Sequence, residues 1–176
     1  MRRFIWTLLL LATSAQAAIY ELGGGISSVF LSQTNGEKNE ETFSRFSLYG
    51  GYQLNAASDQ LLLALVSDKI VDELQLGYLF TLPSLYPYSP FSALPYLKFS
   101  LGLGNTYADT LTLTHASYQF GAGAYGNITQ RLRLRFEMGY RMREWQLDRR
   151  GESSDAQATT WEDSELEFHL GLGYLF

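Results

Sequence analysis

Apolar and polar residues alternate along most of the chain, and this pattern predicts β-strands. The clearest stretch is RLRLRFEMGYRMREW, residues 131–145, in which apolar side chains occupy the even positions from Leu132 to Met142. Arginine, glutamate and glycine occupy the odd positions before Trp145. A helix would spread these residues around its circumference, whereas a strand sends successive side chains to opposite faces. We therefore predict a strand with one apolar face and one charged face.

Eight segments of this kind follow one another, separated by stretches with turn-like composition. Their expected bounds are 18–32, 43–54, 59–66, 71–80, 95–104, 117–126, 131–145 and 165–176. An even number of alternating segments, each of about ten residues, is typical of transmembrane β-barrels. The sequence therefore predicts an all-β protein that forms an eight-stranded antiparallel transmembrane barrel.

Alternation alone does not say which face points inward. A soluble eight-stranded barrel, exported to the periplasm and carrying a small ligand, would bury its apolar face instead. Three features favour the membrane barrel. Glycines recur on the polar face, where a crowded lumen needs room. Aromatic residues collect near the strand ends, as interfacial girdles require. The last strand also remains apolar as far as Phe176.

The first 17 residues are expected to be a cleaved signal peptide. Arg2 and Arg3 precede an apolar run, and the segment closes on Ala15-Gln16-Ala17. The apolar run is much shorter than the roughly 20 residues of a membrane-spanning helix. Residues 18–176 would then form the barrel domain. Loss of the two arginines changes the net charge from −5 to −7, which argues against nucleic acid as a partner.

The composition offers little to a metal or a redox cofactor. The chain has no cysteine, which excludes a disulfide scaffold, a thiolate metal site and a lipid-modified cysteine. Its two histidines, His115 and His169, do not have metal-binding spacing. We therefore expect neither a metal nor a cofactor.

The end of the chain carries a second signal. In ELEFHLGLGYLF, residues 165–176, the apolar face holds Leu170, Leu172, Tyr174 and Phe176. This pattern resembles the assembly signal of bacterial outer-membrane barrels. With the signal peptide, the eight strands and LPYLKFSLGLG at the fifth strand, the chain is similar to small barrels such as the transmembrane domain of outer-membrane protein A. The resemblance implies an outer-membrane location, contact with lipid and recognition by the barrel-assembly machinery. We also expect a monomer.

The same resemblance implies an orientation. Small barrels of this kind keep both termini in the periplasm, with short turns there and longer loops outside. The expected outer loops are 33–42, 67–70, 105–116 and 146–161, and the expected periplasmic turns are 55–58 and 126–130. The connection 81–94 departs from the pattern, because it is long and carries three prolines.

The polar face holds the main candidate site. Six basic side chains face five acidic ones in the predicted lumen, with amides and a histidine between them. These residues are Arg45, Lys98, Arg133, Arg135, Arg141, Arg143, Glu21, Glu73, Glu137, Glu165, Glu167, Gln53, Gln75, Gln119 and His169. Unpaired charges in a narrow interior would cost several kcal/mol each, so we expect mutual pairing. In particular, Arg141 and Arg143 should lie opposite Glu165 and Glu167. The cluster is either a plug or the gate of a narrow pore.

Two motifs raise the question of enzymatic activity. His115 and Ser117 have the His-x-Ser spacing of lipid A deacylases, but the next acid along the chain is Glu137, a full strand later. GAGAYG, residues 121–126, matches a nucleotide-binding glycine pattern but lacks the following helix. We therefore expect a non-enzymatic outer-membrane barrel with a structural or surface-interaction role and a side-chain-filled, porin-like lumen. The alternatives are a lipid A-modifying enzyme and a soluble ligand-binding barrel.

Overall fold

A computed structural model describes residues 20–34, 37–39, 42–54, 59–68, 71–82, 93–108, 111–148 and 160–176. Its strands are β1 (Tyr20–Thr34), β2 (Glu37–Asn39), β3 (Phe43–Gln53), β4 (Gln60–Ser67), β5 (Val71–Thr81), β6 (Leu94–Ala108), β7 (Leu111–Asn127), β8 (Leu132–Asp148) and β9 (Thr160–Leu175). The expected signal peptide and most of the proline-containing connection 81–94 lie outside the described residues. Within the part of the chain that is described, no helix is long and apolar enough to cross a membrane.

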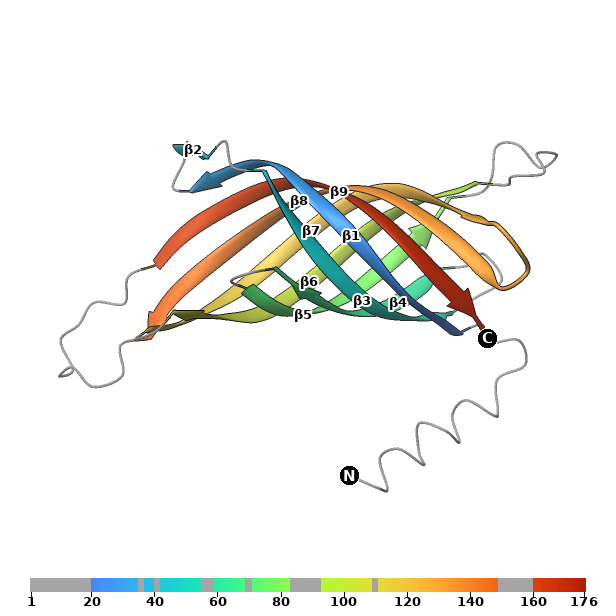
Figure 1. Ribbon diagram of the computed structural model, residues 1–176, viewed down its shortest axis with the longest axis horizontal. Helices are drawn as coiled ribbons and strands as arrows, with labels where there is room; N and C mark the ends of the chain where they lie inside the picture. Colours follow the sequence, from blue (N-terminus) through green and yellow to red (C-terminus); the bar gives the residue numbers. More distant parts are fainter. Residues whose placement is uncertain are drawn as a thin grey trace, which may run out of the picture.

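Eight of these strands close into an antiparallel barrel (Figure 1). Each strand from β3 onward pairs with its neighbour in sequence, and β1 pairs with both β3 and β9. The first and last strands therefore lie side by side, with Glu21 opposite Leu175. The short strand β2 pairs only with the end of β1. The predicted all-β, eight-stranded antiparallel barrel is confirmed.

The two chain ends of the barrel lie at one rim. Tyr20 is opposite Tyr52, and the Phe176 amide donates to the Tyr20 carbonyl at 2.9 Å. We call this rim the terminal end and the opposite rim the distal end. The turn after β7 also lies at the terminal end, where Ile128 N donates to the Leu132 carbonyl at 2.8 Å.

One predicted loop is wrong. Residues 105–116 were expected to form an outer loop, but β6 runs to Ala108 and β7 begins at Leu111, and the ladder continues with Tyr107 opposite Thr112. Four of its twelve residues are threonine, which favours extended backbone. Strand β2 similarly occupies part of the expected loop 33–42. The distal ends of the longer strands therefore extend beyond the predicted bounds.

The apolar face of every barrel strand points outward. Leu48, Leu103 and Phe136 have 67%, 71% and 58% of their surface exposed. Charged residues on the alternate positions are buried instead, and Arg45 retains only 1% exposure. A soluble barrel would have the opposite distribution. The exterior is therefore a continuous apolar surface suited to hydrocarbon.

Strand β4 is the exception to a purely polar interior. It reads QLLLALVS, so both of its faces are apolar. Leu61, Leu63 and Leu65 point outward and are exposed, whereas Leu62 and Val66 point inward and are buried. One wall of the lumen is consequently apolar, while the charged side chains come mainly from β8 and β9.

Candidate functional site

The predicted charged residues all lie in the lumen. Strict alternation on β8 and β9 sends each odd-numbered side chain inward, and β3, β5 and β6 contribute one charged residue each. Ten of them are almost fully buried: Glu21, Arg45, Glu73, Arg133, Arg135, Glu137, Arg141, Arg143, Glu165 and Glu167. Lys98 and His169 are half-buried. An eight-stranded barrel is just wide enough for side chains to fill it, which brings these groups together.

Six charged side chains form a closed cycle near the distal end, which we call the distal ring. Its members are Arg45, Glu165, Arg143, Glu73, Arg141 and Glu167, named in the order of contact. The ion-pair distances around the cycle are 2.5, 2.8, 3.5, 3.7, 3.1 and 3.4 Å, beginning with Arg45–Glu165 and ending with Glu167–Arg45. Three positive and three negative charges alternate around the ring. The ring therefore neutralises itself across the lumen.

The strand ladders explain two sides of the ring. Arg141 lies directly opposite Glu165, and Gly139 lies opposite Glu167. The ion pairs run diagonally instead, from Arg141 to Glu167 at 3.1 Å and from Arg143 to Glu165 at 2.8 Å. Long arginine side chains reach such diagonal neighbours readily. Arg45 completes the ring from β3, and its Nη1 and Nη2 grip both oxygens of Glu165 at 2.5 and 2.8 Å.

Two aspartates outside the predicted set support the distal ring. Asp68 accepts from Arg45 Nε at 3.0 Å. Asp163 lies 3.7 Å from Arg143 and accepts from Trp145 Nε1 at 2.8 Å. Asp68 sits in the connection after β4, so alternation alone could not assign it to the lumen. Asp163 occupies an odd position on β9, where the register continued from Glu165 would have found it.

His115 and Ser117 point into the lumen beside the ring. Both bind Glu73, with His115 Nε2 at 3.0 Å from Oε2 and Ser117 Oγ at 2.5 Å from Oε1. The sequence placed Glu73 in the lumen but did not indicate it as the acid beside this pair, because it lies 42 residues before the histidine. A serine hydrolase needs its serine to donate to the imidazole. Here the hydroxyl donates to the carboxylate, and the His115 side chain is fully buried.

The middle of the lumen is polar but less densely charged. Lys98 Nζ donates to Glu137 at 2.7 Å, and the Tyr96 hydroxyl donates to the same carboxylate at 3.1 Å. Ser27 Oγ and His169 Nδ1 are 2.9 Å apart. His169 therefore has a hydrogen-bond partner on β1, the neighbouring strand. Among the described residues, no group of three or more histidine, aspartate or glutamate side chains is arranged to hold a metal ion.

A second charged group closes the terminal end, and we call it the terminal plug. Its centre is Glu21, whose side chain is fully buried. Arg133 Nη1 donates to Glu21 at 2.9 Å, and Arg135 donates to both of its oxygens at 3.1 and 2.7 Å. Tyr49 and Gln60 add hydrogen bonds at 3.2 and 3.5 Å. One carboxylate thus binds two arginines.

Aromatic and aliphatic side chains complete the terminal plug. Arg133 lies 4.1 Å from the ring centre of Tyr125, and Arg135 lies 5.0 Å from that of Tyr49. Such cation–π contacts stabilise guanidinium groups that share a single carboxylate. The rings pack with Tyr96, Leu62 and Leu79 into a buried apolar cluster. The lumen is therefore closed at this end by packing as well as by charge.

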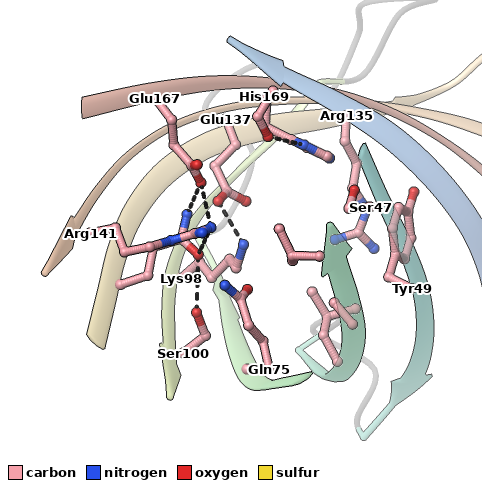
Figure 2. A pocket seen from close by; sticks show the side chains of 16 residues that line it. Ser47, Tyr49, Gln75, Lys98, Ser100, Arg135, Glu137, Arg141, Glu167 and His169 are labelled. Atoms are coloured by element: carbon pink, nitrogen blue, oxygen red, sulfur yellow. Dashed lines mark hydrogen bonds and ion pairs between the residues drawn. The ribbon is translucent and has the colours of Figure 1, made fainter. Parts of the chain in front are cut away.

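A cavity of about 40 Å³ lies between the distal ring and the terminal plug (Figure 2). We call it the central cavity. One side is apolar, with Leu62, Ala64 and Val66 of β4. The other side is polar. The polar lining consists of Ser27, Ser47, Gln75, Lys98, Ser100, Gln119, Arg135, Glu137, Arg141, Glu167 and His169. In Figure 2, Lys98 and Arg141 approach the cavity from one side, and Tyr49 and Arg135 from the other.

The four residues of the expected assembly signal all point outward, three of them on β9 and Phe176 directly after it. Leu170, Leu172 and Tyr174 lie on the apolar exterior, and Phe176 is the most exposed of the four at 70%. Tyr174 and Phe176 pack edge to face with ring centres 5.0 Å apart. The Tyr174 hydroxyl accepts from Arg131 at 2.9 Å. Their aromatic rings therefore form part of the rim at the terminal end.

Solved structures with the same architecture identify the fold. The N-terminal β-barrel domain of OprF from Pseudomonas aeruginosa matches with a TM-score of 0.53 at 14% identity, over 88% of this chain and 97% of that domain. Neisserial surface protein A matches at 0.54 and 11% identity, over 86% and 95% of the two chains. The outer membrane protein OprG from P. aeruginosa matches at 0.54 and 14% identity, over 92% and 97%. This chain has the fold of the small outer-membrane β-barrels.

The outer-membrane barrel fold is shown by structure and not by sequence similarity. No protein-family model matches the chain, and no curated protein sequence matches it. Identities of 11–14% to the three solved barrels fit a fold that is maintained by alternation and turn positions. The charged residues of this lumen must therefore be interpreted from their own contacts.

Proposed function

We propose that the protein is a non-enzymatic outer-membrane barrel with a structural or surface-interaction role and a closed lumen. The observation that carries this proposal is that the barrel has an apolar exterior and a lumen that is blocked twice, by the distal ring and by the terminal plug. Outward leucines and aromatics on all eight strands would lie in hydrocarbon, where hydrogen bonds within a closed barrel satisfy the backbone. The same exterior argues against the soluble ligand-binding alternative, since water would contact it.

The lumen has two obstructions in series, and this favours a plug over a gate. Rearranging the distal ring would remove only the first obstruction. The terminal plug below it also contains the three tyrosines and two leucines of a buried apolar cluster, and these side chains would have to move as well. A narrow gated pore would need both obstructions to open together. We therefore favour a lumen that stays closed.

The lipid A-modifying alternative receives less support from the lumen. The candidate nucleophile Ser117 donates to Glu73 and not to His115. Both side chains point away from the apolar exterior that acyl chains would reach. A lipid substrate would have to enter through the wall or through the ring. Comparing the mass spectra of lipid A from cells with and without the protein tests this alternative directly.

We further propose that the terminal end faces the periplasm. The same rim carries Tyr20, Tyr52, Tyr78 and Tyr174, which fit an interfacial aromatic girdle. The exposed aromatic end of β9 would then be available to the barrel-assembly machinery before insertion. After insertion the same side chains would contact outer-membrane lipid. A single eight-stranded barrel is complete in itself, which is compatible with a monomer.

Cysteine labelling tests location and orientation together, because the chain has no native cysteine. Gln146 and Gln130 are both exposed, the first on β8 near the distal end and the second in the turn at the terminal end. A membrane-impermeant maleimide should label Gln146→Cys on intact cells. It should label Gln130→Cys only after the outer membrane is permeabilised. Reversed labelling would refute the orientation, and labelling of neither variant in intact cells would argue against an outer-membrane location with this orientation.

The variant Glu167→Gln tests the closed lumen. It removes one charge from the distal ring and weakens its contacts with Arg141 and Arg45, so the free energy of unfolding should fall by about 3 kcal/mol at most. Single-channel conductance in planar bilayers should remain at the level of the parent protein, because the terminal plug is unchanged. A clear increase in conductance would show that the ring is the gate of a pore. Unchanged stability would instead contradict the pairing around Glu167.

A further inference from the structure

Several hydrogen-bond donors that line the central cavity have no acceptor within the described ranges of the chain. Arg141 is 2% exposed, yet its Nε and Nη1 donate to no acceptor among the described residues. The nearest carboxylate oxygen of Glu73 is 3.7 Å from Nη1, which allows an ion pair but no hydrogen bond. The Ser47 hydroxyl in the cavity lining also lacks a hydrogen-bond partner in the described part of the chain. Lys98 donates to Glu137, and its ammonium group carries three N–H bonds.

The two carboxylates and the Gln119 carbonyl that line the cavity already accept hydrogen bonds. Glu137 accepts from Lys98 and Tyr96. Glu167 accepts from Arg141 and Gln119. The Gln119 carbonyl accepts from Ser100 at 3.2 Å. A guest in this cavity would therefore meet several free donors and few free acceptors.

The charged residues that line the cavity also favour a guest that accepts hydrogen bonds. Three cationic side chains, Lys98, Arg135 and Arg141, line the cavity together with two carboxylates, Glu137 and Glu167. A water molecule would bring two hydrogens of its own that need acceptors. A halide accepts hydrogen bonds and donates none, and its negative charge complements the excess of cations. Charge-assisted hydrogen bonds of this kind are stronger than neutral ones.

We propose that the central cavity is a binding site for one small monovalent anion of the halide type. Arg141 Nε and Nη1, Lys98 Nζ and the Ser47 hydroxyl hold it, and the apolar side chains of β4 exclude water from its other side. The cavity volume of about 40 Å³ would suit roughly three water molecules. The anion joins β3, β6 and β8 and links the distal ring to the middle of the lumen.

Anion-dependent unfolding tests the proposal. The protein in detergent micelles is unfolded by urea while chloride replaces gluconate at constant ionic strength. For one site that exists only in the folded state, each tenfold rise in chloride above its dissociation constant should raise the folding equilibrium constant about tenfold. Gluconate is too large for the cavity and should give no such rise. Equal stability in the two salts would overturn the proposal.

Two variants and one control locate the effect. Ala64→Leu extends a side chain from the apolar wall into the cavity and should abolish the dependence on chloride. Ser47→Ala removes a hydroxyl that has no described partner, so it should lower chloride affinity severalfold while stability in gluconate changes little. Gly50→Ala adds a methyl group to β3 where nothing lies within 4 Å, and it should keep the full dependence. A dependence that survives both cavity variants unchanged would overturn the proposed site.

Bromide gives a direct view of the ligand. Crystals grown with bromide in place of chloride should show an anomalous peak in the lumen between Lys98 and Arg141. The Ala64→Leu crystals should lack this peak. Its absence from the parent protein would mean that the cavity holds only water, and the proposal would fail.

Discussion

Met138→Arg should lower the free energy of unfolding in a bilayer by about 2–4 kcal/mol, because a guanidinium group would then lie in hydrocarbon. Met138 points outward from the middle of β8 with 49% of its surface exposed, and it lies opposite Phe168 and Ala122 on the neighbouring strands. Every direct neighbour on this face is apolar. Urea-dependent folding into lipid vesicles measures the loss.

A matched control for Met138→Arg should change only the depth of the arginine in the bilayer. Gln146→Arg places the same side chain on the same strand and the same face, beyond the apolar belt near the distal end. It should cost at most about 1 kcal/mol, as expected near the interface. The lumenal change Gly139→Ser should also cost much less than Met138→Arg, since the added Cβ would meet only the tip of the flexible Gln119 side chain at less than 3 Å. Equal folding of Met138→Arg and the parent would refute the membrane-facing exterior.

Glu21→Gln should destabilise the barrel by about 3–5 kcal/mol, because it leaves two buried arginines without their carboxylate. Arg133 and Arg135 both bind Glu21, and their side chains are only 4% and 3% exposed. The remaining contacts of these arginines are with tyrosine rings and neutral amides. Folding equilibria in urea, or the temperature at which the barrel loses its compact migration on gels, would report the loss.

Two comparisons make the Glu21 result specific. Glu144→Gln removes a carboxylate from an exposed position on β8, so it should change stability by no more than about 0.5 kcal/mol. Glu167→Gln should cost less than Glu21→Gln, since Arg141 and Arg45 keep Glu73 and Glu165 as partners. If Glu21→Gln and Glu144→Gln had equal effects, the terminal plug would not depend on its shared carboxylate.

Alternation predicted the strands and the facing of their side chains, because a strand has only two faces. The even positions of β8 and β9 lie outside, and the odd positions lie inside, as the sequence indicates. Strand β4 could not be assigned with the same ease, since QLLLALVS offers apolar residues to both faces. The inward-facing Leu62, which helps to close the lumen, was missed for this reason.

The partners across the lumen could not be predicted from alternation. Arg45 and Glu165 are 120 residues apart, and Glu73 and Ser117 are 44 residues apart. These pairs depend on barrel closure and on the stagger between strands, which add long-range geometry to the local pattern. Adjacent strands were easier, because the hairpin between β8 and β9 already indicated that Arg141 and Arg143 would lie near Glu165 and Glu167. The distal continuation of β6 and β7 was missed because the four threonines of residues 105–116 weaken the alternation of apolar and polar residues there.

The terminal plug forms only when the first strand of the barrel meets a strand near the end of the chain. Glu21 belongs to the first strand, and its two arginines follow 112 and 114 residues later on β8. These three charged side chains therefore remain unpaired until nearly all strands of the barrel have assembled. Contacts between residues so far apart in the sequence form slowly, and they stabilise only the completed barrel. A partly assembled sheet is not stabilised by these ion pairs. The pairing of β9 with β1 and the neutralisation of Glu21 should therefore occur in a single cooperative step.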